Sequence, residues 1–190
     1  MLLKTVLLII ASQGYQPIEY GHTRQMLEEA NIKVEVASNF KHDAVANPNQ
    51  PKPCSCNKAA HQYQVVPVDF ALSEVNADKY DGIFIIGGPG ALGFLDTKIT
   101  HEIMQTIAKS GKPFGALCIS PRILAAAGVL DGKQATGWDE DNKLTGIFKQ
   151  HNVTYVKEPV VTDGSLVTAD GPSAALAFGK AIVAVMQKLS

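Results

Sequence analysis

The chain has 190 residues, of which 46% are hydrophobic, so its length fits about one domain with a sizeable core. Charged residues make up 18% and balance to a formal charge of -1, which leaves no basic surplus for binding nucleic acid. The longest apolar run, Val6 to Ala11, is far shorter than the roughly 18 to 20 residues that cross a bilayer. We therefore expect a single cytoplasmic domain, with no nucleic-acid or membrane partner.

Apolar periodicity predicts strands and helices that alternate along the chain. Short runs rich in aliphatic residues predict strands at 4–11, 32–37, 80–86, 113–117 and 153–156. Longer patterns predict helices at 17–30, 99–109, 119–127, 141–150 and 172–189. Two further strands, 160–162 and 166–168, flank the turn Asp163-Gly164-Ser165 and should form a hairpin. This alternation favours an α/β sandwich around a mainly parallel sheet.

Residues 42–62 interrupt this rhythm. The segment has no periodicity and contains the Asn- and Pro-rich stretch 47–53, so we expect a long surface excursion that contributes nothing to the core. It also holds Cys54 and Cys56, near His42 and His61. The single residue between the cysteines is tighter than the spacing of common zinc motifs, so we expect no metal site. A redox pair or an incidental polar loop are the other interpretations.

A strand, a cysteine and a helix follow one another at 113–127, with Cys118 between strand and helix. Ala116 and Ser120 provide the small residues two before and two after the cysteine that a nucleophile elbow needs. A thiol at a helix N-terminus should have a lowered pKa, although a buried structural cysteine is the plain alternative. Gly87-Gly88 follows another buried strand, so the N–H groups of Gly88 and Ile119 are candidates for an oxyanion hole.

Four segments in this order resemble the DJ-1/PfpI superfamily: IEYGHTRQMLEEANIKVEVAS, YDGIFIIGGPGA, GALCISPRILAAAGVLDGKQAT and VVTDGSLVTADGPSAALAFGKAIV. The resemblance covers nearly the whole chain outside the Pro-rich excursion. It implies a flavodoxin-like three-layer α/β/α sandwich, usually a homodimer, with a cysteine nucleophile and a nearby glutamate. Counting back about twelve residues from Asn31, as the family pattern implies, places that glutamate at Glu19.

In that role Glu19 is buried beside Cys118 and exchanges a proton with it, whereas its position alone also suits a carboxylate at a helix start. Protease-like members of the superfamily have His after the cysteine, where this chain has Ile119, and His or Tyr near the position of Trp138. His22, Gly87 and Trp138 are possible pocket residues.

Asp170 lies in the sequence Thr-Ala-Asp-Gly-Pro, after the last predicted strand. This context is typical of a turn, although the loop should lie near the carboxyl edge of the sheet.

The resemblance favours a cofactor-free enzyme of the glyoxalase or deglycase type, which acts on small electrophilic carbonyl compounds through Cys118 assisted by Glu19. One alternative is a hydrolase or hydratase of small amides or isonitriles. Another is a redox sensor or chaperone in which Cys118 is oxidised without turnover.

Overall fold

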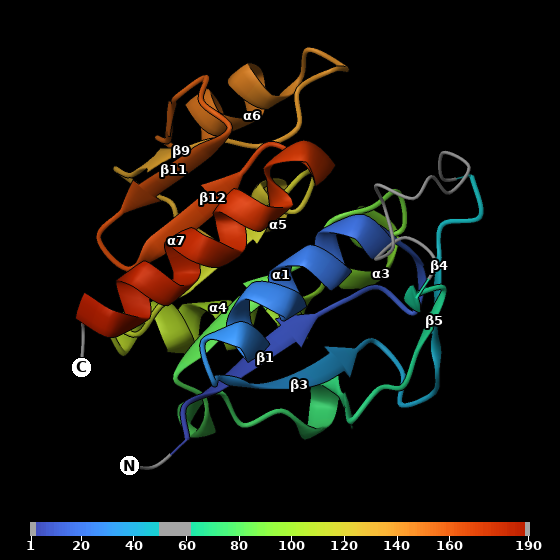
Figure 1. The fold of residues 1–190 in the computed structure, drawn as a ribbon. Helices are drawn as coiled ribbons and strands as arrows, with labels where there is room; N and C mark the ends of the chain where they lie inside the picture. Colours follow the sequence, from blue (N-terminus) through green and yellow to red (C-terminus); the bar gives the residue numbers. More distant parts are fainter. Residues whose placement is uncertain (1–2, 50–61, 189–190) are drawn as a thin grey trace.

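The computed structural model describes residues 3–49 and 62–188 of the chain. A seven-stranded sheet with the order β11-β12-β8-β7-β1-β3-β6 runs through its centre (Figure 1). Its strands are β1 Thr5–Ile9, β3 Lys33–Ser38, β6 Phe70–Ala71, β7 Gly82–Ile85, β8 Phe114–Leu117, β11 Val160–Asp163 and β12 Leu166–Ala169. All neighbours pair in parallel except β11 and β12, which form the predicted hairpin. The predicted mainly parallel α/β architecture is therefore confirmed.

Helices cover both faces of this sheet. The helices are α1 Pro17–Glu29, α3 Ala91–Leu95, α4 Lys98–Lys109, α5 Pro121–Ala126, α6 Leu144–Gln150 and α7 Ala175–Lys188. Helices α1 and α7 lie side by side on one face, where they pack on the side chains of Val6 and Leu8. The neighbouring Leu7 and Ile9 point to the opposite face and pack with residues of α4 and α5. Both faces of β1 are thus buried, which explains its unbroken aliphatic sequence.

The N-terminus of α1 positions one part of the candidate site. The Gln16 side chain accepts a hydrogen bond from the N–H of Ile18, and Pro17 occupies the first helical turn. At the other side of α1, the helix packs closely on α7. A Cβ on Gly179 would lie 2.7 Å from the Cβ of Met26, so this close approach requires glycine.

The segment predicted as a surface excursion begins with ordered structure. Strand β4, Ala44–Ala46, pairs with β2, Gln13–Tyr15, and with β5, Val65–Val66, in a three-stranded sheet. Ala44 and Ala46 are buried in the core, so the prediction that this segment contributes nothing to the core is wrong at this end. The alternation of buried and exposed residues spans only three positions, too few to detect in the sequence. Residues 50–61, with both excursion cysteines, lie outside the described residues.

Several boundaries differ from the sequence-based ones. Helix α5 begins at Pro121, two residues later than predicted, and α6 begins at Leu144. The predicted strand at 153–156 exists as β10, Thr154–Tyr155, but it pairs only with β9, Gln134–Ala135, apart from the main sheet. Short 3-10 turns lie at Leu72–Glu74, Ala77–Lys79 and Pro172–Ala174.

No helix in the described part of the chain is long and apolar enough to cross a membrane.

Candidate active site

Cys118 occupies a sharp turn between β8 and α5, at the carboxyl edge of the sheet. Its φ of 61° lies in the left-handed region, which is rare for a residue with a side chain. The N–H of Cys118 donates to the carbonyl of Ala169 at 2.9 Å, and its own carbonyl accepts from the N–H of Trp138 at 2.7 Å. The Ser120 hydroxyl donates to the carbonyl of Ile86 at 3.0 Å. The strained conformation is therefore held by bonds to three neighbouring segments.

Glu19 lies next to this turn and is completely buried. Its Oε2 accepts a hydrogen bond of 3.0 Å from the N–H of Gly87, which follows β7, and its carboxyl interacts with the Cys118 thiol. The structure thus brings together two residues that are 99 positions apart (118 minus 19). Glu19 does not cap its own helix, because Gln16 has that role. The alternative interpretation of Glu19 as a simple helix-start residue does not describe these contacts.

Gly87 packs against the side chains of Cys118 and Glu19 and leaves no room for a side chain of its own. A Cβ added there would lie 2.5 Å from the Cβ of Cys118 and 2.8 Å from the Oε2 of Glu19. Any larger residue would have to displace the thiol or the carboxyl. Gly87 therefore forms the wall against which the pair is packed.

Burial dominates the protonation of this pair. It raises the pKa of Glu19 to about 8, although hydrogen bonds from Cys118 and Gly87 oppose the increase. Burial also raises the pKa of the Cys118 thiol, and the adjacent Glu19 carboxylate raises it further. The prediction of a lowered thiol pKa is wrong, because burial and the neighbouring Glu19 outweigh the backbone N–H groups that favour the thiolate. Burial of the pair therefore disfavours the charged form of the thiol.

Two backbone donors partly offset this effect. The N–H groups of Gly88 and Ile119 form hydrogen bonds with the Cys118 sulfur and oppose the increase in its pKa. These are the two donors expected to form an oxyanion hole. Both donors therefore lie close to the sulfur, the atom to which a substrate carbon would become bonded.

The family model of the DJ-1/PfpI family matches residues 4–185. The chain belongs to the DJ-1/PfpI family. It is 28% identical over 185 residues to a glutathione-independent glyoxalase of Caenorhabditis elegans, covering 97% of this chain and 89% of the relative. It is also 28% identical to a deglycase of Pyrococcus abyssi, over 95% of this chain and 98% of the relative. A crystal structure of a ThiJ/PfpI domain protein from Brachyspira murdochii has the same fold, with a TM-score of 0.85, 24% identity and 99% of both chains covered.

The DJ-1/PfpI chain departs from a cysteine-histidine arrangement at this site. Ile119 follows the cysteine, and its side chain has no proton to transfer. His22 lies one turn after Glu19 on α1 and is half-buried, which lowers its pKa. Within the described residues, no hydrogen bond joins His22 to Cys118 or Glu19. The nearest acid-base partner of the thiol is thus a carboxyl.

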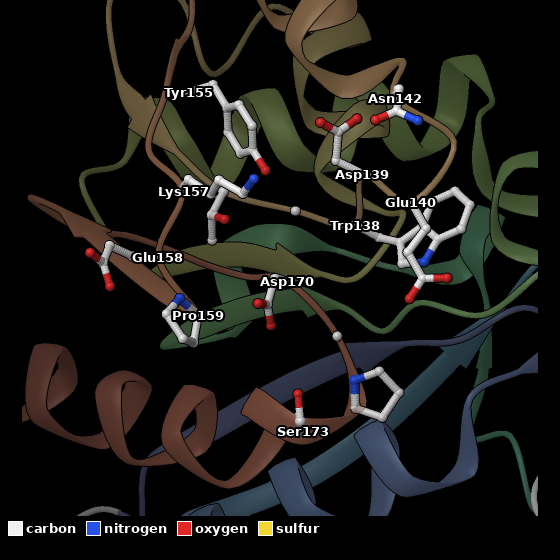
Figure 2. Close-up of a pocket in the computed structure, with 14 residues that line it drawn as sticks. Trp138, Asp139, Glu140, Asn142, Tyr155, Lys157, Glu158, Pro159, Asp170 and Ser173 are labelled. Atoms are coloured by element: carbon white, nitrogen blue, oxygen red, sulfur yellow. The ribbon is translucent and has the colours of Figure 1, made fainter.

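A cavity of about 550 Å³ adjoins the DJ-1/PfpI elbow on the side of β9 and β10 (Figure 2). Trp138 lines it, and the backbone N–H of Trp138 donates to the carbonyl of Cys118. The cavity does not include Cys118, Glu19, His22 or Gly87 in its lining. Its other lining residues are Thr136, Gly137, Asp139, Glu140, Asn142, Tyr155, Lys157, Glu158, Pro159, Asp170, Gly171, Pro172 and Ser173.

The sequence around Asp170 is typical of a turn, and the structure adds a second feature. It directly follows Ala169, whose carbonyl binds the N–H of Cys118, and it lines the cavity. Its Oδ1 is buried and has no hydrogen-bond partner in the described part of the chain. The one available sequence signal was its place after a central strand, where the loops of parallel sheets carry functional groups.

The described residues contain no group of three or more His, Cys, Asp or Glu side chains arranged to hold a metal ion. Cys118 is the one free cysteine among them. The excursion residues Cys54, Cys56 and His61 lie outside this part of the chain, and the described His42 is exposed.

Proposed function

We propose that this chain is a cofactor-free enzyme of the glyoxalase or deglycase type, acting on small electrophilic carbonyl compounds through Cys118 and Glu19. The observation that carries the proposal is the buried Cys118–Glu19 pair, with the N–H groups of Gly88 and Ile119 directed at the sulfur. The names of the glyoxalase and deglycase relatives support the same reaction class.

The first step is addition of sulfur to the carbonyl carbon. The Glu19 carboxylate accepts the thiol proton as the carbon–sulfur bond forms and the carbonyl π electrons move to oxygen. That oxygen accepts hydrogen bonds from Gly88 and Ile119, and Glu19 then returns the proton to it. The product is a hemithioacetal, with no net change in atoms or charge.

With an α-oxoaldehyde, the same carboxyl would complete the reaction. It would remove the hydrogen of the former aldehyde carbon as a proton, which leaves an enediolate, and return a proton to the neighbouring carbon. The hydroxyl proton moves to the second oxygen, and the hemithioacetal becomes a thioester. Water then cleaves the thioester to a 2-hydroxy acid and restores the thiol. Amide hydrolysis fits less well, because it needs an acid for the leaving amine and Ile119 provides none.

The test is an assay of purified wild-type protein with methylglyoxal, which follows loss of the substrate and formation of the hydroxy acid. Cys118→Ala should abolish turnover, and Glu19→Gln should lower kcat/KM by about 10²-fold or more, the usual scale of acid-base catalysis. Glu29→Gln, on the exposed end of the same helix, serves as the control and should retain activity.

The pH dependence of the activity provides an independent check. Because the pKa of Glu19 is raised to about 8, its carboxylate is lost as the pH falls through that value. The kcat/KM of the wild type should therefore rise with pH and level off above about pH 8. Unchanged turnover in Cys118→Ala would contradict the proposal. So would oxidation of Cys118 without turnover, or turnover of amides or isonitriles alone.

The homodimer expected from the family stays a prediction. Sedimentation of the full chain at several concentrations would test it.

A further inference from the structure

Arg122 is a buried charged side chain that the proposed reaction does not use. It lies in the first turn of α5 and is 8% exposed. Its Nη1 and Nη2 donate to the two carboxylate oxygens of Asp141 at 2.9 Å and 2.6 Å, and Nη2 also donates to the carbonyl of Trp138 at 3.2 Å. Its guanidinium carbon lies 5.4 Å from the centroid of the Trp138 ring. One side chain of α5 thus holds the segment 137–143 at two points.

Stability alone is a weak reason for such an arrangement. Removing a guanidinium group from water is costly, and a buried ion pair often contributes no more to stability than well-packed apolar side chains would. The Nε of Arg122 adds to that cost, because it is buried and has no hydrogen-bond partner in the described part of the chain. A role in the geometry of the site accounts for this charge better.

The segment that Arg122 holds contacts the nucleophile residue directly. The backbone N–H of Trp138 donates to the carbonyl of Cys118 at 2.7 Å. Gly137 packs on the same turn so closely that a Cβ there would lie 3.1 Å from this carbonyl oxygen. Within the described residues, this bond and those of Arg122 are the hydrogen bonds that join residues 137–143 to residues 118–122. The position of the Trp138 N–H therefore depends on Arg122.

A fixed Cys118 carbonyl also fixes the N–H that follows it. The peptide group between Cys118 and Ile119 is planar and trans, so its oxygen and its N–H point in opposite directions. The oxygen accepts from Trp138, and the N–H forms its hydrogen bond with the Cys118 sulfur. Rotation of this peptide group would remove both contacts at once. One of the two backbone donors of the proposed reaction would then be lost.

We propose that Arg122 is a positioning residue, which keeps the Cys118–Ile119 peptide group in the orientation that directs the N–H of Ile119 at the sulfur. Arg122 acts through Trp138 and Asp141 and does not touch the substrate. The effect of this N–H on turnover rests on the proposed function, whereas its effect on the thiol does not. The ion pair holds the pKa of Asp141 at about 2, so its carboxylate stays charged at neutral pH.

The reactivity of the thiol tests this orientation without any turnover. The N–H of Ile119 favours the thiolate, so its loss should lower the thiolate fraction and slow alkylation. Arg122→Met keeps much of the length of the side chain and removes its donors. Labelling by iodoacetamide at about pH 8, followed for the Cys118 peptide by mass spectrometry, should be about three- to tenfold slower in this variant. That range reflects one lost hydrogen bond to a charged group, partly offset because a more basic thiolate is more nucleophilic.

Arg24→Met is the matched control. Arg24 also donates to a carboxylate, that of Glu28, and its guanidinium carbon lies 5.9 Å from the centroid of an aromatic ring, that of Tyr20. In the described part of the chain it has no hydrogen bond to residues 118–122. Arg24→Met should therefore leave the alkylation rate of Cys118 unchanged, and circular dichroism should show that both methionine variants are folded.

Two other variants grade the effect and keep the test available if Arg122→Met does not fold. Arg122→Lys keeps the charge but lacks the planar fork that holds both oxygens of Asp141, so its alkylation rate should lie between those of the wild type and Arg122→Met. Asp141→Asn removes the ion pair and keeps the arginine. It should also slow the alkylation of Cys118.

Steady-state kinetics with methylglyoxal connect the positioning to turnover. Arg122→Met should lower kcat by about 10²-fold with a KM close to that of the wild type, because an oxyanion donor acts mainly in the transition state. A residue that only stabilised the fold would lower the unfolding free energy and leave both kcat and the alkylation rate of the folded protein unchanged.

The outcomes separate this inference from the proposed function. Unchanged or faster alkylation in the folded Arg122 and Asp141 variants, or an equal decrease in Arg24→Met, would overturn the positioning role, whatever the result with methylglyoxal. Slower alkylation in the Arg122 and Asp141 variants alone would support it even if no carbonyl compound were turned over. In that case only the proposed carbonyl chemistry would fail.

Discussion

Replacing Glu19 by Gln should change how the stability of the protein depends on pH. In the unfolded chain this carboxyl titrates near its ordinary value of 4.5, whereas burial raises its pKa in the folded protein to about 8. Between these values the folded state keeps a proton that the unfolded state has lost. The contribution of Glu19 to stability is therefore fully present below about pH 4.5 and is lost as the pH rises through about 8.

The size of the effect follows from the difference between the two pKa values. At about 1.4 kcal/mol per pKa unit, the increase from 4.5 to about 8 corresponds to roughly 5 kcal/mol of unfolding free energy. Glutamine has the same shape, can accept the hydrogen bond from Gly87 and has no charge to bury. The variant should thus be close to the wild type in stability at about pH 5 and more stable by several kcal/mol at about pH 9.

Urea unfolding at several pH values measures this difference directly. Titrations of groups away from the Cys118–Glu19 pair occur in both proteins and cancel in the comparison, and Glu29→Gln on the exposed end of α1 controls for the substitution itself. Should the stability difference between wild type and Glu19→Gln be the same at both ends of the pH range, the carboxyl would not be a buried neutral acid. The account of its proton exchange with Cys118 would then be wrong as well.

Two further substitutions and one control variant test the packing around the site and the core. Gly87→Ala places a methyl group 2.5 Å from the Cβ of Cys118, so it should lower stability by about 1 to 3 kcal/mol in thermal unfolding and reduce turnover by about 10²-fold. Gly146→Ala, in an open position of α6, should be neutral or stabilising by up to about 1 kcal/mol; a similar loss in both variants would contradict the steric argument. Phe178→Ala removes a fully buried ring that packs edge-to-face on Phe84. Chemical denaturation should show that the unfolding free energy falls by about 3 to 5 kcal/mol. A decrease below about 1 kcal/mol would show that this ring does not hold α7 on the sheet.

Much of the fold could be predicted because its signals are local. The aliphatic run of β1, the Pro at the start of α1 and the Asp-Gly-Ser turn of the hairpin each depend on a few neighbouring residues. The short strands have no such local signal, so the sequence does not predict them. Ala44–Ala46 and Gln134–Ala135 form strands only because distant segments pair with them.

The position of Cys118 between a strand and a helix, and the small residues around it, were readable from the sequence. The family resemblance added Glu19. The direction of the thiol pKa was not readable, because it depends first on burial and on the neighbouring Glu19. Burial depends on what packs over a residue, and no local pattern contains that information.

The sequence by itself determined the order of strands and helices and the turn that presents Cys118, because these follow from side-chain periodicity and local backbone preferences. The tertiary structure decided how deeply Glu19 and the thiol are buried together and that Asp170 lines a cavity with Tyr155. These contacts join segments far apart in the chain, at the edge of a sheet whose strand order is not the order of the sequence. That arrangement excludes water from the carboxyls, and their burial in turn shifts their pKa values.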